Sequence, residues 1–270
     1  MVAAESVPPV KNADVFEDLA RYYDPLMEHV NYDRWFFITA ALADLVPAPF
    51  RHLDAACGTA TLVEKLRRTG WESIGVDLSP AMIAAGRKKD PRLPLAVSDL
   101  RSIPFVDSVD LVTCLFDSLN FLLDEKDLAL AFQQLYGALR PGGVLYADII
   151  TERMVTDHFE NQDWEENNEG FRTRWSSRYD HARNIAESRV RVNTGAASVI
   201  CERVYPRERV EQLLEDAGFS VFGVFDAESW KAPSKKTTRV DFVAVKDPTP
   251  ELKRRFTKVT AQVREMVYAT

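Results

Sequence analysis

Short apolar runs alternate with stretches of helical spacing along most of this chain. Between the runs, apolar residues recur every three or four positions, which is the spacing of a helix with one buried face. Strands that alternate with helices predict parallel pairing, because each helix carries the chain back across the sheet. The pattern therefore predicts an α/β fold with a doubly wound, mostly parallel sheet, whose strands lie at 50–56, 71–77, 93–100, 109–116, 143–150, 219–227 and 239–246.

Residues 151–205 interrupt this alternation and follow a period of two instead. An acidic connector at 160–169 precedes three alternating segments, and these segments predict an antiparallel sheet of three strands at 171–179, 185–193 and 197–205. In the first segment one face is aromatic and the other face carries three arginines. Residues 151–205 are therefore expected to form an insertion in the larger sheet.

Composition limits the class of protein. Hydrophobic residues make up 46% of the 270 residues and charged residues 28%, the balance of a globular protein with a sizeable core. The net charge of −7 disfavours a nucleic-acid track, which needs a basic surface. The chain has no apolar run long enough to cross a membrane and no secretion signal at its start, and its three cysteines form no C-x-x-C pair. We therefore expect a protein of the reducing cytoplasm, without nucleic-acid or membrane partners.

A final amphipathic stretch runs from residue 251 to residue 268. Its apolar residues fall on one helical stripe, and its basic residues lie outside that stripe. A helix that packs on the body or on a dimer partner is favoured over a membrane-surface helix, because an acidic body repels anionic lipid. The expected organisation is a core at 14–150 and 206–247, a β insertion at 151–205 and a C-terminal helix at 248–270.

Candidate chemistry begins where the first strand turns into the first helix. The turn from Ala56 to Ala60 holds only small side chains, so a ligand can approach its backbone closely. Nineteen residues after Gly58, the second strand ends at Asp77, where a carboxylate can accept both hydroxyls of a ribose. The turn lacks the G-x-G-x-x-G spacing that a dinucleotide requires. A nucleoside other than NAD or FAD is therefore expected.

The turn resembles motif I of the class I S-adenosylmethionine-dependent methyltransferases, D-x-G-x-G-x-G, with alanine at two of its glycine positions. A long helix over 128–139 is expected to stop at the L-R-P-G-G junction of residues 139–143, with Arg140 in its last turn. This junction and a third strand that ends in an acid strengthen the resemblance. It implies a seven-stranded sheet with an antiparallel hairpin of the last two strands at its edge. It also implies that S-adenosylmethionine is the cofactor, held by residues of the strand ends and of the helix that Ser79 caps: Asp54, Ala56, Gly58, Asp77, Leu78, Met82, Asp99, Leu100 and Leu115.

Two further helical patterns precede the first strand. The segments Y-Y-D-P-L-M at 22–27 and V-N-Y-D-R-W at 30–35 resemble the start of a bacterial branch of small methyltransferases. In that branch the N-terminal helices close over the cofactor and an aromatic hydroxyl reaches its carboxylate. Tyr23 and Trp35 are the candidates for this role. The alternative, that these aromatic residues only pack the helices on the sheet, stays open.

The fourth strand corresponds to motif IV, whose polar residues face the departing methyl group. Asp117 follows this strand and is the candidate catalytic residue, as a base, as an ammonium ligand, or only as a support of the turn at 118–120. The insertion resembles the β lid of sugar-amine N-methyltransferases and of glycine N-methyltransferase. Its residues Trp175, Tyr179 and Arg174 are therefore candidates for substrate contact, unless the aromatic face packs on the core and the arginines are solvated.

N-methylation of a small-molecule amine is the preferred function. No histidine falls in a motif position, which favours an amine over an acceptor that needs a strong base, and the histidines have no metal-ligand spacing. O-methylation of a small metabolite is the close alternative. A nucleic-acid or protein methyltransferase and a non-catalytic cofactor-binding module are weaker alternatives. No metal is expected, and the chain is a possible homodimer.

Overall fold

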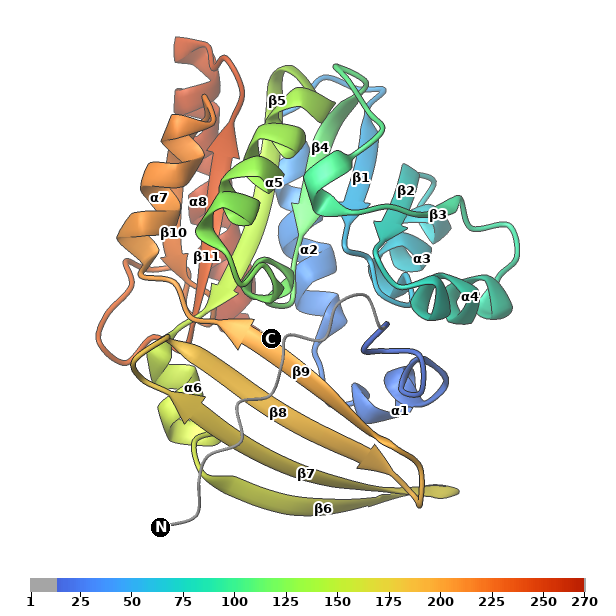
Figure 1. Cartoon of the computed structure of the whole chain (residues 1–270). Coiled ribbons are helices and arrows are strands. Elements are labelled where there is room, and N and C mark those ends of the chain that lie inside the picture. Colours follow the sequence, from blue (N-terminus) through green and yellow to red (C-terminus); the bar gives the residue numbers. More distant parts are fainter. Residues whose placement is uncertain (1–13, 270) are drawn as a thin grey trace.

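Seven strands form one sheet, sheet A, in the computed structural model, which describes residues 14–269 (Figure 1). Their order is β10-β11-β5-β4-β1-β2-β3, and β11 is antiparallel to both of its neighbours, β5 and β10. The predicted doubly wound, mostly parallel sheet with an antiparallel hairpin at its edge is confirmed. The strands are β1 (Arg51–Ala55), β2 (Glu72–Asp77), β3 (Leu95–Val97), β4 (Val109–Cys114), β5 (Leu139–Ile150), β10 (Ser220–Asp226) and β11 (Arg239–Val245).

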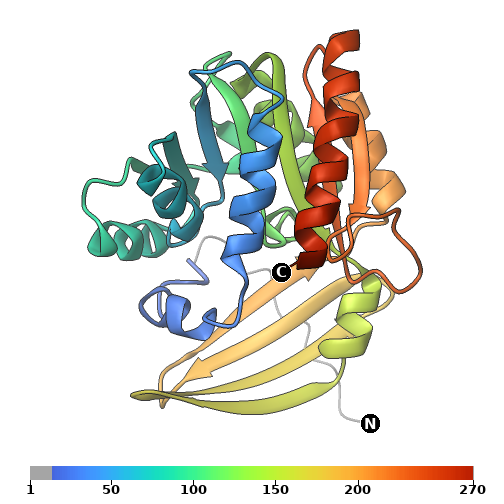
Figure 2. The same ribbon diagram turned by 180° about the vertical axis from the view of Figure 1, so that it is seen from behind.

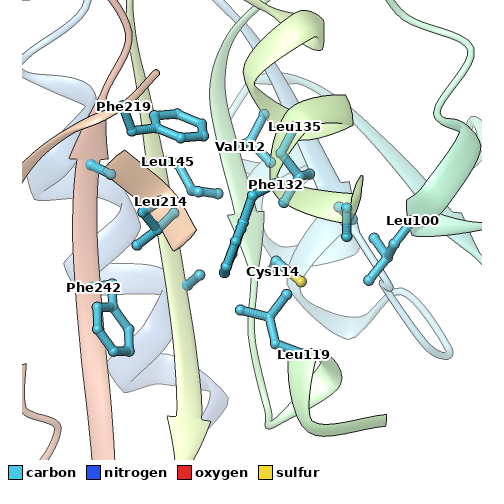
Figure 3. Close-up of a cluster of buried hydrophobic side chains, with 14 of the residues drawn as sticks. Leu100, Val112, Cys114, Leu119, Phe132, Leu135, Leu145, Leu214, Phe219 and Phe242 are labelled. Carbon is cyan, nitrogen blue, oxygen red and sulfur yellow. The ribbon is translucent and has the colours of Figure 1, made fainter. Parts of the chain in front are cut away.

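Helices cover sheet A on both faces. On one face, α5 (Glu125–Ala138) and α7 (Arg207–Asp216) pack against β4, β5 and β11, and Phe132 of α5 is fully buried beside Val112 and Leu145 of these strands (Figure 3). On the other face lie α2 (Tyr32–Ala43), α3 (Thr61–Arg68) and α8 (Pro250–Ala269) (Figure 2). Both faces are covered, so the central strands are apolar on each side, as the continuous runs predicted. The helix α4 (Pro80–Lys89) connects β2 to β3.

The C-terminal helix packs on the body of this chain. In α8, Leu252, Phe256, Val259 and Val263 are buried in the same cluster as Leu42 of α2, and the two helices lie side by side (Figure 2). Each such side chain contributes about 1.5–3 kcal/mol when it is fully buried. The predicted stripe is therefore the contact surface of the helix.

Two local predictions are wrong. Arg140 was expected in the last turn of a helix, but α5 ends at Ala138 and Arg140 lies in β5, where its Nη1 is 3.0 Å from Asp110. A buried carboxylate across the sheet thus outweighs the helix dipole. The segment before α2 was expected to be a helix, but it forms turns, the 3₁₀ turn η1 (Ala20–Tyr22) and the short α1 (Tyr23–Leu26). Pro25 has no N–H to donate there, which prevents a longer helix.

A second sheet, sheet B, lies across the carboxyl ends of the parallel strands (Figure 1). The predicted three strands are β7 (Phe171–Asp180), β8 (Ile185–Val192) and β9 (Ala197–Arg203). The connector before them is not a loop, because its residues form a fourth strand, β6 (Gln162–Asn168), antiparallel to β7. The acidic composition of this segment gave no apolar pattern from which a strand could be predicted. The strand forms nevertheless, and Glu165 lies opposite Arg174 in its register. The helix α6 (Glu152–His158) leads into sheet B.

The two faces of sheet B have different surroundings. Phe171 is buried against Leu19 and Tyr22 of the N-terminal segment, and Trp175 joins the same cluster. Arg174 is on the opposite face, where its side chain is 73% exposed and pairs with Glu165 at 2.6 Å. The aromatic face is therefore the inner face, and the arginines of β7 are on the outer face.

Within residues 14–269, no helix combines the length and the apolar character that a membrane crossing requires.

Candidate active site

The turn after β1 has an unusual backbone. Ala56, Gly58 and Ala60 all adopt positive φ angles, at 65°, 54° and 65°. Glycine takes this conformation without strain, whereas alanine has a steric cost in the left-handed region of about 1–2 kcal/mol. The two alanines therefore keep the backbone geometry of the glycines that they replace in the motif. A side chain built on Gly58 would meet only open space, so this side of the turn is accessible to a ligand.

Asp77 connects this turn to the next helix. Its Oδ2 accepts the backbone N–H of Gly58 at 2.8 Å, and its Oδ1 accepts the N–H of Ser79 at 2.8 Å. Burial raises the pKa of this carboxyl, and the two backbone hydrogen bonds oppose that effect. Ser79 caps α4 by accepting the N–H of Met82 at 3.0 Å, as predicted, and the side chain of Met82 is buried.

Two exposed apolar side chains lie beside Asp77. Leu78 is 63% exposed and Val97 is 53% exposed, and Val97 pairs with Asp77 in the register of β2 and β3. Exposed apolar surface next to a carboxylate fits a nucleoside, because a flat base needs apolar contact and a ribose needs acceptors. The residues present therefore fit S-adenosylmethionine, whose ribose Asp77 would hold and whose base Leu78 would contact. Val97 was not among the predicted residues, although its place in a short strand before Asp99 was visible.

Asp99 begins the 3₁₀ turn η2 (Leu100–Ser102), where it accepts the N–H of Arg101 at 2.8 Å. The guanidinium of Arg101 also holds this carboxylate at 2.6 Å, and these hydrogen bonds lower the pKa of Asp99. An adenine amine would therefore share Asp99 with Arg101. Leu100 is buried in the main core, so only its backbone can face a ligand.

Asp54 lies at the end of a chain of buried polar groups. His52 Nδ1 is 2.8 Å from Ser73 Oγ, and His52 Nε2 is 2.9 Å from Thr113 Oγ1. The same Thr113 hydroxyl donates to Asp54 at 2.6 Å. Burial lowers the pKa of His52 to about 3 and raises the pKa of Asp54 to about 7, so the histidine is neutral at pH 7. This histidine supports the motif from inside the sheet and does not reach the surface.

The N-terminal segment closes over the turn. Thr59 donates to Asp24, which also pairs with Lys89 at 2.9 Å, and Ser79 Oγ donates to Asp14 at 2.6 Å. These contacts hold residues 14–26 against the turn and the start of α4, and the closure over the cofactor that the resemblance implied stays a prediction. The apolar pattern of the sequence could not predict these contacts, because they join polar side chains that are far apart in the sequence.

Tyr23 lies between the two ends of the site. Burial raises the pKa of its hydroxyl, and both Asp117 and Asp77 are close enough to raise it further. Trp35 is buried, with its ring centroid 5.3 Å from that of Phe116 and 5.5 Å from that of Tyr32. Tyr23 therefore lies at the centre of the site, whereas Trp35 supports the turn after β4 from behind. Leu115, the last residue before that turn, is buried in the same cluster as Trp35.

The turn after β4 has a strained backbone at two successive residues. Phe116 and Asp117 have φ angles of 59° and 55°, a conformation that costs residues with side chains energy and that clusters at functional sites. The buried carboxylate of Asp148 accepts the N–H groups of both residues, at 3.1 and 2.7 Å. Asp117 then begins η3 (Ser118–Phe121) with its side chain directed away from the backbone of that turn, because it makes no capping hydrogen bond there.

Arg239 joins the two carboxylates. Its Nη2 is 2.6 Å from Asp117 Oδ1, its Nη1 is 3.0 Å from Asp148 Oδ2, and its side chain is 15% exposed. Burial opposes the charge on Arg239, but the two carboxylates outweigh it and raise the pKa of this arginine. Neither Asp148 nor Arg239 was among the predicted site residues. Asp148 is the one acid in an otherwise apolar strand, and Arg239 is the charged first residue of another strand. Each charged residue could have been noticed as an exception to the apolar pattern of its strand.

The predicted substrate residues of sheet B are not brought together. Trp175 stacks on Trp164 of β6, with ring centroids 5.4 Å apart and parallel planes. Tyr179 is near the other end of β7, where its hydroxyl donates to Glu152 at 3.5 Å, and Arg174 is on the outer face. Within residues 14–269, no group of three or more His, Cys, Asp or Glu residues is arranged to hold a metal ion.

Comparison with known proteins agrees with this geometry. The family described as "Methyltransferase domain" matches residues 53–143, which run from β1 into β5. A crystal structure of an S-adenosylmethionine-dependent methyltransferase from Clostridium acetobutylicum ATCC 824 is 25% identical and superposes with a TM-score of 0.74, over 86% of this chain and 98% of that chain. The chain is therefore a class I S-adenosylmethionine-dependent methyltransferase, with the fold and the cofactor that the resemblance implied.

Curated relatives give a narrower comparison. A Bacillus subtilis (strain 168) protein named "Putative methyltransferase YqeM" is 29% identical over 247 residues, 87% of this chain and 98% of that protein. A demethylmenaquinone methyltransferase of Thermus thermophilus is 37% identical over 48% of this chain and 62% of that protein. A dTDP-3-amino-3,4,6-trideoxy-alpha-D-glucopyranose N,N-dimethyltransferase of Streptomyces venezuelae is 31% identical over 40% of this chain and 47% of that protein.

Proposed function

We propose that this enzyme methylates the nitrogen of a small-molecule amine. The observation that supports the proposal is the position of Asp117, a carboxylate at the end of β4 whose charge acts on the same Tyr23 hydroxyl as the ribose acid Asp77. A carboxylate at this end of the site attracts an ammonium group and repels an anionic acceptor. The similarity to an amino-sugar N,N-dimethyltransferase supports the same acceptor class.

The residues of the chain have three tasks in this reaction. Bound S-adenosylmethionine supplies an electrophilic sulfonium methyl group. Asp77 and the turn at 56–60 hold the cofactor, and the segment at 14–26 excludes water from the site, which preserves the alignment of the reacting atoms. Asp117 binds the ammonium form of the acceptor and takes up one of its protons, because an amine reacts only in its neutral form. Arg239 fixes the direction of that carboxylate.

A hydroxyl or ring-carbon acceptor is the second candidate, because the relative from Thermus thermophilus carries the name demethylmenaquinone methyltransferase and is 37% identical in the matched part. A paired panel separates the two. Methyl-labelled S-adenosylmethionine is incubated with amines and with hydroxyl compounds that lack an amino group. Glucosamine is tested beside glucose, and benzylamine is tested beside phenol. Label in the amines alone is the expected result. Label in phenol but in no amine would replace the first proposal by the second.

A further inference from the structure

Sheet B brings a second carboxyl group to Asp117. Glu202 is in β9, the strand of sheet B that runs back into the core, and it pairs with Ala186, which itself pairs with Tyr179. This register places Glu202 on the inner face, the same face as Trp175. After burial, the charge and hydrogen bonding of Asp117 are what most raise the pKa of its carboxyl, so the two carboxyl groups lie close together. A hydrogen bond between two carboxyl groups requires that one of them carries a proton.

One oxygen of Glu202 has no hydrogen-bond partner in the described part of the chain. Its Oε1 is sealed from solvent and has no hydrogen-bond partner among residues 14–269. Buried polar atoms without a partner are rare, because each costs about 1–3 kcal/mol. Beside Asp117, such an oxygen needs a donor, which a shared proton or an entering ammonium group would supply. The strand itself is fixed there, since Asn120 Nδ2 donates to the carbonyl of Arg203 at 2.8 Å and Asn120 Oδ1 accepts the N–H of Ile150 at 3.1 Å.

Electrostatics agree with this arrangement. Arg239 pairs with Asp117 and Asp148 and also acts on the charge of Glu202, and the charge of Asp117 acts on the hydroxyls of Tyr23 and Tyr32. Burial raises the pKa of Glu202 well above its ordinary value, Asp117 raises it further, and Arg239 lowers it. Like charges in contact cannot both ionise freely, so the pair retains a proton until a cation replaces it.

We propose that Glu202 and Asp117 form a proton-sharing pair that binds the ammonium form of the acceptor and removes one of its protons. This inference rests on the proposed function and identifies the second catalytic group, which comes from the insertion and not from the methyltransferase core. It also limits the acceptor to compounds with a basic nitrogen, because the site holds more carboxylates than cations and therefore favours a positively charged ligand.

The proposed step conserves protons and electrons. The entering ammonium displaces the shared proton, which leaves to solvent, so both carboxylates are ionised against the cation. One N–H proton then moves to the pair, and a neutral amine remains. The amine nitrogen forms its bond to the methyl carbon with its electron pair as the carbon–sulfur bond breaks, and the electrons of that bond stay on sulfur. The products are a methylated ammonium, a neutral thioether and the pair with its shared proton restored.

A titration tests the pair without any acceptor. The full chain is labelled with carbon-13 at the glutamate carboxyls, and the resonance of Glu202 is identified by its absence in Glu202→Gln. We expect a midpoint at least about 1.5 pH units above the ordinary glutamate value of about 4.3, and a fall of about one pH unit or more in Asp117→Asn, because a neighbouring negative charge is removed. A midpoint near 4.3 that Asp117→Asn does not move would overturn the inference.

Kinetics test the role of the pair. With the most rapidly labelled amine of the panel, Glu202→Gln should lower kcat/KM about 100-fold at pH 7, in the range of a general base, with unchanged affinity for S-adenosylmethionine. The acid limb of the pH profile should move to lower pH in this variant. The control is Glu187→Gln, which removes a carboxylate from the strand beside β9, where it pairs with Arg189 at 2.7 Å. It should leave both rate and profile unchanged.

The outcomes separate this inference from the proposed function. Labelled amines together with a Glu202 that titrates normally, or a Glu202→Gln rate within about threefold of the parent (well below the 100-fold expected for a general base), would keep the proposed function and overturn the inference. Label in phenol alone would overturn both. A raised midpoint that depends on Asp117, together with the loss of rate, would establish the pair. If Glu202→Gln lowers the melting temperature strongly, Glu202→Asp, which keeps the acid but shortens its reach, replaces it in the kinetic test.

Discussion

Asp148 Oδ1 accepts the backbone N–H of Asp117 at 2.7 Å, while Asp148 Oδ2 accepts the N–H of Phe116 at 3.1 Å and a guanidinium N–H of Arg239 at 3.0 Å. One fully buried carboxylate of β5 thus holds the strained turn that presents Asp117. The residue supports the position of the candidate base, and its own oxygens are fully occupied by the protein.

Asp148→Ala should lower the free energy of unfolding by about 3 kcal/mol or more, because it leaves Arg239 with one carboxylate in a buried site and removes two hydrogen bonds from a strained turn. Urea denaturation measures this change. Asp163→Ala is the matched control: Asp163 pairs with Arg178 at 3.2 Å on the surface, with both side chains more than half exposed, and should change stability by about 0.5 kcal/mol or less. Equal effects of the two changes would contradict the role of Asp148.

Asp77→Ala should weaken binding of S-adenosylmethionine by about 10- to 100-fold, which corresponds to the 1.5–3 kcal/mol of hydrogen bonds to a charged group. Titration calorimetry measures the affinity. Asp77 also supports the N–H groups of Gly58 and Ser79, so the melting temperature is recorded for each variant. Asp90→Ala, which removes the partly buried partner of the exposed Arg92, is the control. Unchanged affinity in Asp77→Ala would remove this residue from the cofactor site.

His52 and Asp54 should affect stability in opposite directions between about pH 4 and pH 6.5. The folded pKa of His52 is lowered to about 3, so the unfolded chain alone gains this proton as the pH falls below about 6.5, and stability decreases. The folded pKa of Asp54 is raised to about 7, so the unfolded chain alone loses this proton as the pH rises above about 4, and stability decreases in that direction. Near pH 5 the two effects oppose each other.

Single variants should separate these slopes. Relative to the parent, Asp54→Asn should gain stability as the pH rises from about 4 to 7, by up to about 1.4 kcal/mol per pH unit. His52→Gln should instead gain stability as the pH falls from about 6 to 4. Urea midpoints at each pH measure both slopes. Parallel pH curves for the two variants would show that neither group titrates as the buried network requires.

Ala56→Gly should raise the free energy of unfolding by about 0.5–1 kcal/mol. Glycine removes the steric cost of the positive φ at this position, about 1–2 kcal/mol, and part of that gain is lost to the greater freedom of the unfolded chain. Ala261→Gly, at an exposed position inside α8, should instead lower stability by about 1 kcal/mol. Thermal or urea unfolding measures both. Destabilisation at both positions would show that the left-handed turn carries no strain.

The cofactor end of the site was visible in the sequence because it is built from local signals. The small residues at 56–60, the acid at the tip of β2 and the serine cap before α4 each follow from neighbours in the chain. Parallel strands place their carboxyl ends at one edge of the sheet, so the acids of successive strands meet there without further information. The apolar runs likewise determined the layers, since a strand covered on both faces has no polar face to show.

The acceptor end was decided by the tertiary structure. Alternation in β9 put Glu202 on one face of a strand, but only the register with β8 and the position of sheet B over the core show that this face meets Asp117. Arg239 is 122 residues from Asp117 in the sequence, and Asp148 lies on a different strand again. The energy of these groups depends on burial and on partners across the fold, which no local pattern contains. The sequence by itself therefore determined the sheet and the predicted nucleoside site at its edge, whereas the charges around Asp117 were set by long-range packing.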